Sequence, residues 1–443
     1  MSMNTTDALL MAAFGGGTKT VIIPRKEINF LDIKGNVFRA YDKTQFLALT
    51  EMPNPPSADG MKPRGWNWTL PEAKAAVEAN GTLDVAPEYD TNDGSTRIYV
   101  HFEEGRSSPF IRIENINGTV TLDFGDGSPI ETKSGTGQTT DYLPVQHTFA
   151  PGDYVIKVTP TVEGTTYVLP GENQKGSRIL QKTLSGENLE GYVYKSSIRK
   201  VEMGVGAKLG NQAFQDCFSL ASISLPSDLT EIPTDAFRSC IGLKSVSVPK
   251  GVTTIDQYAF SGCTNLEQVS LPNTITTINT NAFSSCRKLT DIVLPGSTTS
   301  LGSSALSSCF TLVKICIPSG VSSISTSLLQ NCYGLSNLRF TGLVAPSPSS
   351  SNWYSNIPTD CIIEVPYGGL ASYLSASNYP KKTTYTYLGY ATYTSGAALP
   401  AQDGTEAYNV TWYATRADAK AGTNPITEGN GNEIYCTYAA VTA

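Results

Sequence analysis

The fold of this chain is decided by the stretch AFRSCIGLKSVSVP (residues 236–249), which returns 23 residues later as AFSGCTNLEQVSLP (residues 259–272). Six cysteines mark successive copies at the same interval: Cys217, Cys240, Cys263, Cys286, Cys309 and Cys332. In most copies an Ala-Phe pair precedes the cysteine, and a short apolar strand ending at proline follows it. A unit of 23 residues cannot bury these apolar positions alone, so the copies are predicted to stack as a solenoid.

The L-x-x-I-x-L-P…A-F-x-x-C pattern resembles the BspA-like leucine-rich repeats, a bacterial and protozoan surface-protein class. The resemblance covers about residues 196–345 and implies short strands on one side of a curved stack, with turns or short helices on the other. It also implies that the repeats bind a ligand. The first coil, Ser196 to Gly210, is one residue out of step at its strand, as terminal coils often are. A last strand at 361–366 and a helix at 368–377 look like the closing unit of the same family.

Composition restricts the function of the 443-residue chain. Its net charge of −7 lacks the basic excess that phosphate contacts need, so we expect no nucleic-acid partner. There are two histidines, His101 and His147, which leaves little material for histidine-based catalysis or zinc binding. We expect no enzyme activity and no cofactor. No apolar run approaches the roughly 18 residues of a membrane span, so no membrane insertion is expected either.

Two further segments precede the repeats. Gly118 to Ser128, His147 to Phe149 and Pro151 to Val158 resemble a PKD-type β-sandwich module, which usually serves as a spacer. Upstream of it, alternation predicts a hairpin over 27–41, and capping boxes predict helices that begin after Asp42 and Thr69. The stretch with Trp66 and Trp68 resembles the amino-terminal module of phage structural proteins.

The predicted fold is mainly β and multidomain. It comprises a flexible or anchoring segment (1–20), an α+β module (21–96), a PKD-like β-sandwich (97–165), a linker (166–195), the leucine-rich repeat solenoid (196–345), a capping unit (346–390) and a small β-rich module (391–443).

Several residues could be given a metal-binding or ligand-binding role, but for these residues we expect a structural role. The six-cysteine ladder is predicted to be reduced, buried and free of metal, because a linear column offers an ion two near neighbours where zinc needs four ligands. Cys316 is expected on the exposed strand face. The acids Asp123, Asp126 and Asp153 are expected to shape turns, with calcium binding left open. Trp66 and Trp68 are expected in a core, with a sugar platform as the alternative.

What remains for function is the outward strand face of the solenoid. We predict a binding face that includes Gln268, Asp291, Lys314, Asn337 and Arg339. A simply solvated sheet face is the alternative.

These patterns favour a non-enzymatic phage virion protein, of the head or tail fibre or decoration type. Residues 1–96 would contact phage capsid or tail proteins, and the repeat arm would attach to a host surface protein or glycan. A homo-oligomer is expected. The alternative is a bacterial cell-surface adhesin of the BspA-like class. We prefer the virion because no Lys or Arg precedes the apolar stretch 8–14, so no secretory signal is expected.

Overall fold

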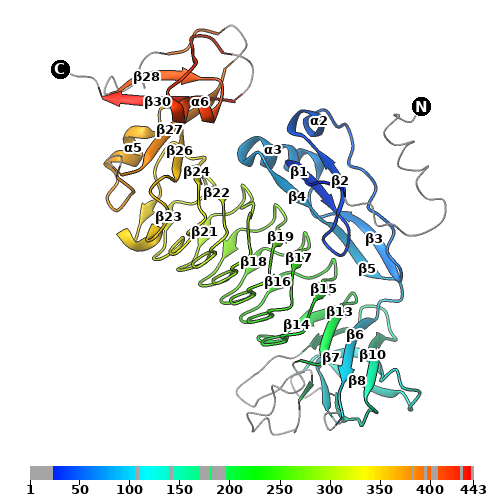
Figure 1. Cartoon of the computed structure of the whole chain (residues 1–443). Helices are drawn as coiled ribbons and strands as arrows, with labels where there is room; N and C mark the ends of the chain where they lie inside the picture. The colour runs from blue at the N-terminus through cyan, green and yellow to red at the C-terminus, as the bar shows by residue number, and fades with distance from the viewer. Residues whose placement is uncertain are drawn as a thin grey trace.

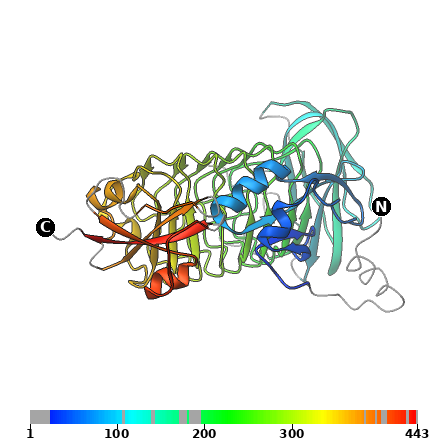
Figure 2. The same ribbon diagram turned by 90° about the horizontal axis from the view of Figure 1, so that it is seen from above.

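The computed structural model describes residues 23–104, 109–138, 143–169, 180–181, 196–381, 384–393, 397–400, 408–429 and 433–440. The predicted anchoring segment 1–20 lies outside these residues. The chain is mainly β, as predicted, and about eight solenoid turns cross residues 200–390. Figure 1 shows the solenoid in the middle, a β module at each of its two ends, and the amino-terminal module alongside its strands. Viewed from above, that amino-terminal module again lies over the solenoid (Figure 2).

Two rows of parallel strands build the solenoid. The first row comprises β13 (Ile198–Glu202), β15 (Ser222–Ser224), β17 (Ser245–Ser247), β19 (Gln268–Ser270), β22 (Lys314–Ile317), β24 (Asn337–Phe340) and β26 (Ile362–Pro366). The second comprises β16 (Glu231–Ile232), β18 (Thr254–Ile255), β20 (Thr277–Ile278), β21 (Ser300–Leu301), β23 (Ser323–Ile324) and β25 (Ser347–Pro348). Val246 is in register with Val269, whereas Val201 pairs with Ile223, so the first coil is one residue out of step as predicted.

Aromatic and sulfur columns fill the space between the two rows. The rings of Phe214, Phe237, Phe260 and Phe283 stack nearly parallel, with centroids 5.2 to 5.7 Å apart. Each cysteine thiol from the second copy on donates a hydrogen bond to a backbone carbonyl of the preceding coil, as Cys263 Sγ does to Phe237 O at 3.1 Å. All nine cysteines are free and buried. The sequence predicted burial of the ladder but not these hydrogen bonds.

Every coil also carries two turn positions in the left-handed backbone region. The first positions are Gln212, Asp235, Tyr258, Asn281, Ser304 and Ser327, and the second are Asp216, Ser239, Gly262, Ser285, Ser308 and Asn331. These positions flank the apolar pair, so the chain reverses tightly on each side of the residues it buries. Short polar residues and glycine tolerate this conformation best, which explains why they recur there.

The β module before the repeats is continuous with the solenoid. Its strands are β6 (Thr96–Phe102), β7 (Phe110–Asp123), β8 (Glu131–Thr136), β9 (Leu143–Gln146), β10 (Gly152–Pro160), β11 (Thr166–Leu169) and β12 (Leu180–Gln181). Strand β6 pairs with β13, and β11 pairs with β14 (Ala207–Leu209). Residues 166–169 fall in the expected linker but form β11 of the sheet, because the alternating Tyr167 and Leu169 are buried.

The amino-terminal module has the predicted local structure. It comprises β1 (Ile28–Leu31), β2 (Val37–Tyr41), α2 (Lys43–Leu47), β3 (Met61–Trp66), α3 (Leu70–Asn80), β4 (Leu83–Val85) and β5 (Pro87–Thr91). Strands β1 and β2 form the expected hairpin. Both capping boxes are present, at Asp42 and at Thr69. Trp66 and Trp68 are buried, as the structural interpretation predicted.

At the other end, the solenoid sheet runs on into the carboxyl-terminal module. The elements are η2 (Ser351–Tyr354), α5 (Leu370–Ser375), β27 (Thr386–Thr392), β28 (Tyr408–Tyr413), α6 (Arg416–Ala421), β29 (Pro425–Ile426) and β30 (Glu433–Ala440). One sheet has the order β22-β24-β26-β27-β30-β28-β29, so the expected boundary between 390 and 391 falls inside β27. The predicted strand and helix of the closing unit correspond to β26 and α5.

The first prediction concerns the thiol ladder. A thiol must ionise to react, and burial raises the pKa of Cys263 and of Cys332 to about 12. We therefore expect a thiol reagent to label the ladder in the native protein only as fast as the protein unfolds, and to label it at once in denaturant. Rapid stoichiometric labelling of the six cysteines without denaturant would contradict the buried ladder.

The second prediction concerns the carboxyl-terminal cap. Trp353 is fully buried, and its carbonyl accepts a hydrogen bond from Leu329 N at 2.7 Å, so the residue continues the core beyond the last repeat. Trp353→Ala should lower the free energy of unfolding by about 3–5 kcal/mol, measured by urea denaturation. The control is Tyr333→Ala, which removes an aromatic ring that is 55% exposed one coil earlier and should change stability little. Equal effects of the two substitutions would show that Trp353 does not close the core.

Candidate functional site

The strand face of the solenoid is covered by the amino-terminal module. Asn67 is fully buried between the two: its amide donates to Ser270 Oγ at 2.8 Å, and its side-chain oxygen accepts from Ala86 N at 2.9 Å. Ser270 Oγ in turn donates to Asp84 O at 2.7 Å. A buried polar group this well satisfied fits a permanent contact better than a transient one.

Further contacts extend along several coils. Glu88 accepts a hydrogen bond from Lys250 N at 2.6 Å, and Asp90 accepts one from Ser227 N at 3.2 Å. Val293 of the solenoid packs against the apolar core of the amino-terminal module. The strand face is therefore not free here, contrary to the prediction. Side chains from a segment some 180 residues earlier in the chain occupy it.

The five residues of the predicted binding face have different environments. Gln268 and Asp291 line a cleft beside the amino-terminal module, and Lys314 is half-buried next to Asp291. Asn337 and Arg339 are each 4% exposed, so these two do not form part of an open surface. Cys316 is likewise buried, 4.0 Å from the carbonyl of Ala79 on α3, and not on an exposed face as expected. Ligand binding by the five residues stays a prediction.

Arg339 serves instead to join the solenoid to the carboxyl-terminal module. Its guanidinium donates to both carboxylate oxygens of Glu433 and lies 3.6 Å from the centroid of the Tyr390 ring. It also reaches Glu364 at 3.4 Å, and Glu364 is paired with Arg416. Burial alone would raise the pKa of Glu433, but the hydrogen bonds and charge of Arg339 outweigh burial and lower that pKa. The network therefore keeps buried charges paired.

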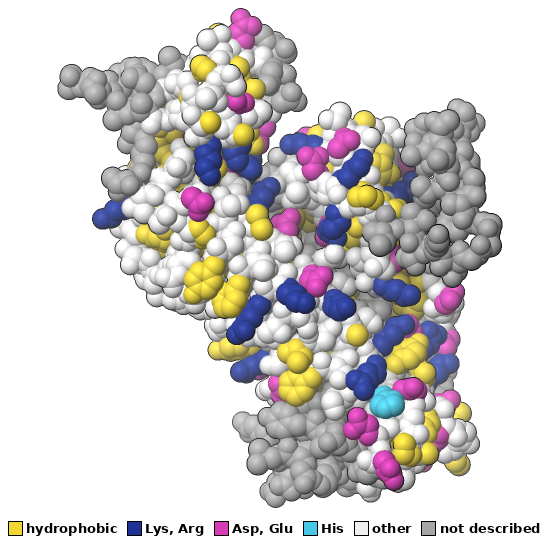
Figure 3. All heavy atoms as spheres, viewed as in Figure 1, with side chains coloured by type: hydrophobic (Ala, Val, Ile, Leu, Met, Phe, Trp, Pro, Cys, Tyr) yellow, Lys and Arg dark blue, Asp and Glu magenta, His cyan; other side chains and the backbone are white. Residues whose placement is uncertain are grey.

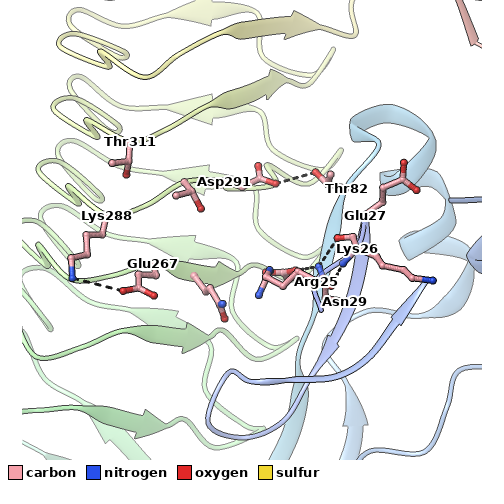
Figure 4. A pocket seen from close by; sticks show the side chains of 12 residues that line it. Arg25, Lys26, Glu27, Asn29, Thr82, Glu267, Lys288, Asp291 and Thr311 are labelled. Carbon is pink, nitrogen blue, oxygen red and sulfur yellow. Dashed lines mark hydrogen bonds and ion pairs between the residues drawn. The ribbon is translucent and has the colours of Figure 1, made fainter. Parts of the chain in front are cut away.

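A polar cleft of about 470 Å³ remains between the solenoid and the amino-terminal module. It is lined by Arg25, Lys26, Glu27, Asn29, Thr82, Asp84, Glu267, Gln268, Lys288, Thr290, Asp291 and Thr311. Figure 4 shows residues of the solenoid strands and turns on one side and of the amino-terminal module on the other. Within it, Lys288 pairs with Glu267 at 3.9 Å, and Arg25 pairs with Asp84. Both signs of charge are thus available to a ligand.

The deep wall of the cleft is formed by Asp291. Its carboxylate accepts a hydrogen bond from Thr82 Oγ1 at 3.0 Å, and burial raises the pKa of this carboxyl group. Burial also lowers the pKa of the neighbouring Lys314. Thr82 of the docked module thus holds the Asp291 carboxylate in the wall of the cleft.

The described residues of the cleft contain no histidine or cysteine that a hydrolytic or transfer reaction would use as base or nucleophile. The two histidines lie in the β module: His101 Nδ1 is 2.8 Å from Asp153 Oδ1, and His147 Nε2 is 2.7 Å from Asp126 Oδ2. His147 also stacks on Phe124, with centroids 3.8 Å apart.

Asp123 and Asp126 shape turns as the sequence predicted, whereas Asp153 lies in strand β10 and pairs with His101. Asp123 accepts from Gly125 N at 2.8 Å, and Asp126 accepts from Ser128 N at 3.0 Å. In the described parts of the chain, no group of three or more His, Cys, Asp or Glu is arranged to hold a metal ion. Nor does any helix in those parts have the length and apolar character needed to cross a membrane.

Sequence reasoning missed the amino-terminal half of the cleft. Arg25 precedes β1, Thr82 precedes β4 and Asp84 lies in β4, and no motif marks any of the three. The one available signal is the column of serines Ser224, Ser247 and Ser270 on the strands, whose small side chains leave room for another module. A column of serines is equally expected on a strand face that contacts only solvent.

Comparison with known proteins agrees with the repeat assignment. Residues 207–336 match the family model "BspA type Leucine rich repeat region" in six copies, so this segment is a BspA-type repeat region. No curated protein matches the chain.

Among solved structures, the chain is similar to a leucine-rich repeat protein of Treponema pallidum, at 26% identity over 41% of this chain and 82% of that one, with a TM-score of 0.27. It is also similar to a leucine-rich cell surface protein of Faecalibacterium prausnitzii, at 19% identity over 65% of this chain and 94% of that one, with a TM-score of 0.31. TM-scores this low give no basis for transferring a role. None of these comparisons supports the PKD-like or phage resemblances.

A third prediction tests the docking of the amino-terminal module. Asn67→Ala should lower the free energy of unfolding by about 1–3 kcal/mol, because Ser270 and Ala86 lose buried hydrogen-bond partners. Asn92→Ala, at an exposed site in the same module, is the control and should stay within about 0.5 kcal/mol of wild type. Urea denaturation measures both. An Asn67 variant as stable as wild type would mean that the module does not depend on this contact.

A fourth prediction concerns acid stability. A hydrogen bond from His147 is the main cause that lowers the pKa of Asp126 from 3.8 to about 2. Because the folded pKa is below the unfolded one, Asp126 contributes stability that is complete above pH 3.8 and is lost as the pH falls towards 2. Urea denaturation at several pH values should show a weaker acid destabilisation in Asp126→Asn and in His147→Gln than in wild type. A wild-type pH dependence in both variants would exclude this pair as a source of acid sensitivity.

Proposed function

We propose that this chain is a non-enzymatic, adhesion-type protein of the bacterial cell surface, in which the repeat solenoid holds a ligand-binding cleft. The BspA-type repeat region at 207–336 supports the proposal, because the class that the sequence resembles consists of surface proteins whose repeats bind. The observation that carries the binding role is the open polar cleft of about 470 Å³ between the solenoid and the amino-terminal module.

The proposal differs from the virion role that the amino-terminal segment suggested. Described residues of the amino-terminal module pack on the solenoid through buried contacts such as that of Asn67, so part of that module's surface is engaged within the chain. Attachment to a capsid or tail through residues 1–96 would have to use the remaining surface. The homo-oligomer expected under the virion role stays a prediction.

Localisation tests this proposal directly. Antibodies against the purified protein should label the envelope of intact bacteria that encode the chain, and protease treatment of intact cells should remove the label. The purified protein should also coat host cells or matrix in a saturable way. Label on phage particles from the same culture, with an unlabelled bacterial envelope, would overturn the surface assignment in favour of the virion role.

A further inference from the structure

The turns that follow the cysteines form an exposed ledge along one edge of the solenoid. The residue after each cysteine lies in the same place on successive coils, and these residues are Phe218, Ile241, Thr264, Arg287, Phe310 and Tyr333. On the last three of these coils, an exposed cation is followed by two aromatic rings. We name Arg287, Lys288, Phe310, Thr311 and Tyr333 the edge strip.

The rings and cation of the edge strip contact one another. The Arg287 guanidinium carbon lies 5.2 Å from the Phe310 ring centroid, and the Phe310 and Tyr333 centroids are 5.3 Å apart at an interplanar angle of 45°. Tyr333 is 55% exposed, Phe310 is half-buried, and both Arg287 and Lys288 are exposed. Such open aromatic area costs hydration energy unless a partner covers it.

The backbone holds the edge strip rigidly. Thr311 Oγ1 donates to Arg287 O at 2.8 Å and to Leu289 O at 3.1 Å, which ties two neighbouring turns together. Gly334 lies so close to the turn below that a Cβ atom there would be 2.9 Å from Phe310 O. The backbone that carries the rings is therefore already ordered, so ligand binding loses no conformational entropy in ordering it.

Charge is segregated on the solenoid although the repeats are neutral as a whole. Exposed Lys244, Arg287 and Lys288 lie on the turns beside the cysteines, where Glu267 is the exposed acid among the described neighbours. The exposed acid Asp228 lies in the turn between β15 and β16, the exposed acid Glu231 begins β16, and Asp291 is half-buried in the wall of the cleft. Figure 3 shows Lys and Arg side chains next to hydrophobic ones on this face of the solenoid.

The edge strip also opens into the cleft. Lys288 and Thr311 belong to both, and Thr290 and Glu267 continue the same wall. A chain lying along the strip would therefore place one end, or a branch, among the polar groups of the cleft.

We infer that the edge strip and the cleft together bind an extended glycan that carries carboxylate or sulfate groups. The aromatic rings would stack on the apolar faces of sugar rings, while Arg287 and Lys288 would pair with the acidic groups. Hydroxyl and amide groups of the cleft would bond to sugar hydroxyls. This inference rests on the proposed function, since it names the ligand class for the same cleft.

The test measures binding of three purified glycans by calorimetry: a heparin octasaccharide, a hyaluronan octasaccharide and neutral dextran. The whole protein should bind one or both acidic oligosaccharides, more weakly as salt rises, and should not bind dextran. Phe310→Ala and Arg287→Ala should each weaken binding about tenfold or more. The matched controls are Phe218→Ala, at the same turn position of the first copy, and Lys208→Ala, an exposed cation on β14, and both should bind as wild type does.

Other outcomes would overturn the inference. Failure of both acidic oligosaccharides to bind, wild-type affinity in the edge-strip variants, or equal affinity for neutral dextran would each show that no acidic-glycan site exists there. These results leave the surface location intact, because envelope labelling does not depend on the edge strip. Conversely, oligosaccharide binding without envelope labelling would support glycan binding by the edge strip and would contradict the proposed location on the cell surface.

Discussion

The structure depends on the stacking of one coil on the next, because no coil buries its own apolar residues. Two hydrogen bonds repeat along the stack, one between backbone groups and one from a cysteine thiol to a backbone carbonyl. The N–H of Phe237 donates to Ala259 O of the following coil at 2.8 Å, while the thiol of Cys263 donates to Phe237 O of the preceding one. Each Phe-Cys unit is thus bonded in both directions, and its ring stacks on the ring of the next copy. Because each coil is bonded to both of its neighbours, we expect the solenoid to unfold cooperatively.

A stack of this kind has two open ends and one open strand face, and the chain covers all three. At one end β6 pairs with β13, and at the other β27 pairs with β26, so both ends of the first strand row continue into a neighbouring sheet. The amino-terminal module covers the strand face through Asn67 and its neighbours. What stays accessible along the repeats is the turn side and the margin of the docked module, and this is where the cleft forms.

Sequence reasoning predicted the parts of this fold that are local or repeated. The strand register follows from the 23-residue period, and the helix starts follow from capping boxes at Asp42 and Thr69. It missed the docking, because contacts such as Thr82 with Asp291 join residues 209 positions apart, and both side chains have the polarity of a solvated surface. Arg339 was expected on an open face for the same reason: its acidic partner Glu433 comes from another module.

The edge positions also explain how a repetitive scaffold can carry a specific site. Within this one chain, the buried Leu three residues after each cysteine hardly tolerates change, because it fills the same space between identical neighbours in every coil. The residue just after the cysteine faces outward and is free to differ, and it ranges from Ile241 through Arg287 to Tyr333. A solenoid therefore fixes positions at regular intervals while leaving their chemistry independent. We expect specificity to come from those variable edge residues and from the module docked beside them, since the stacked interior is apolar in every coil and closed to solvent.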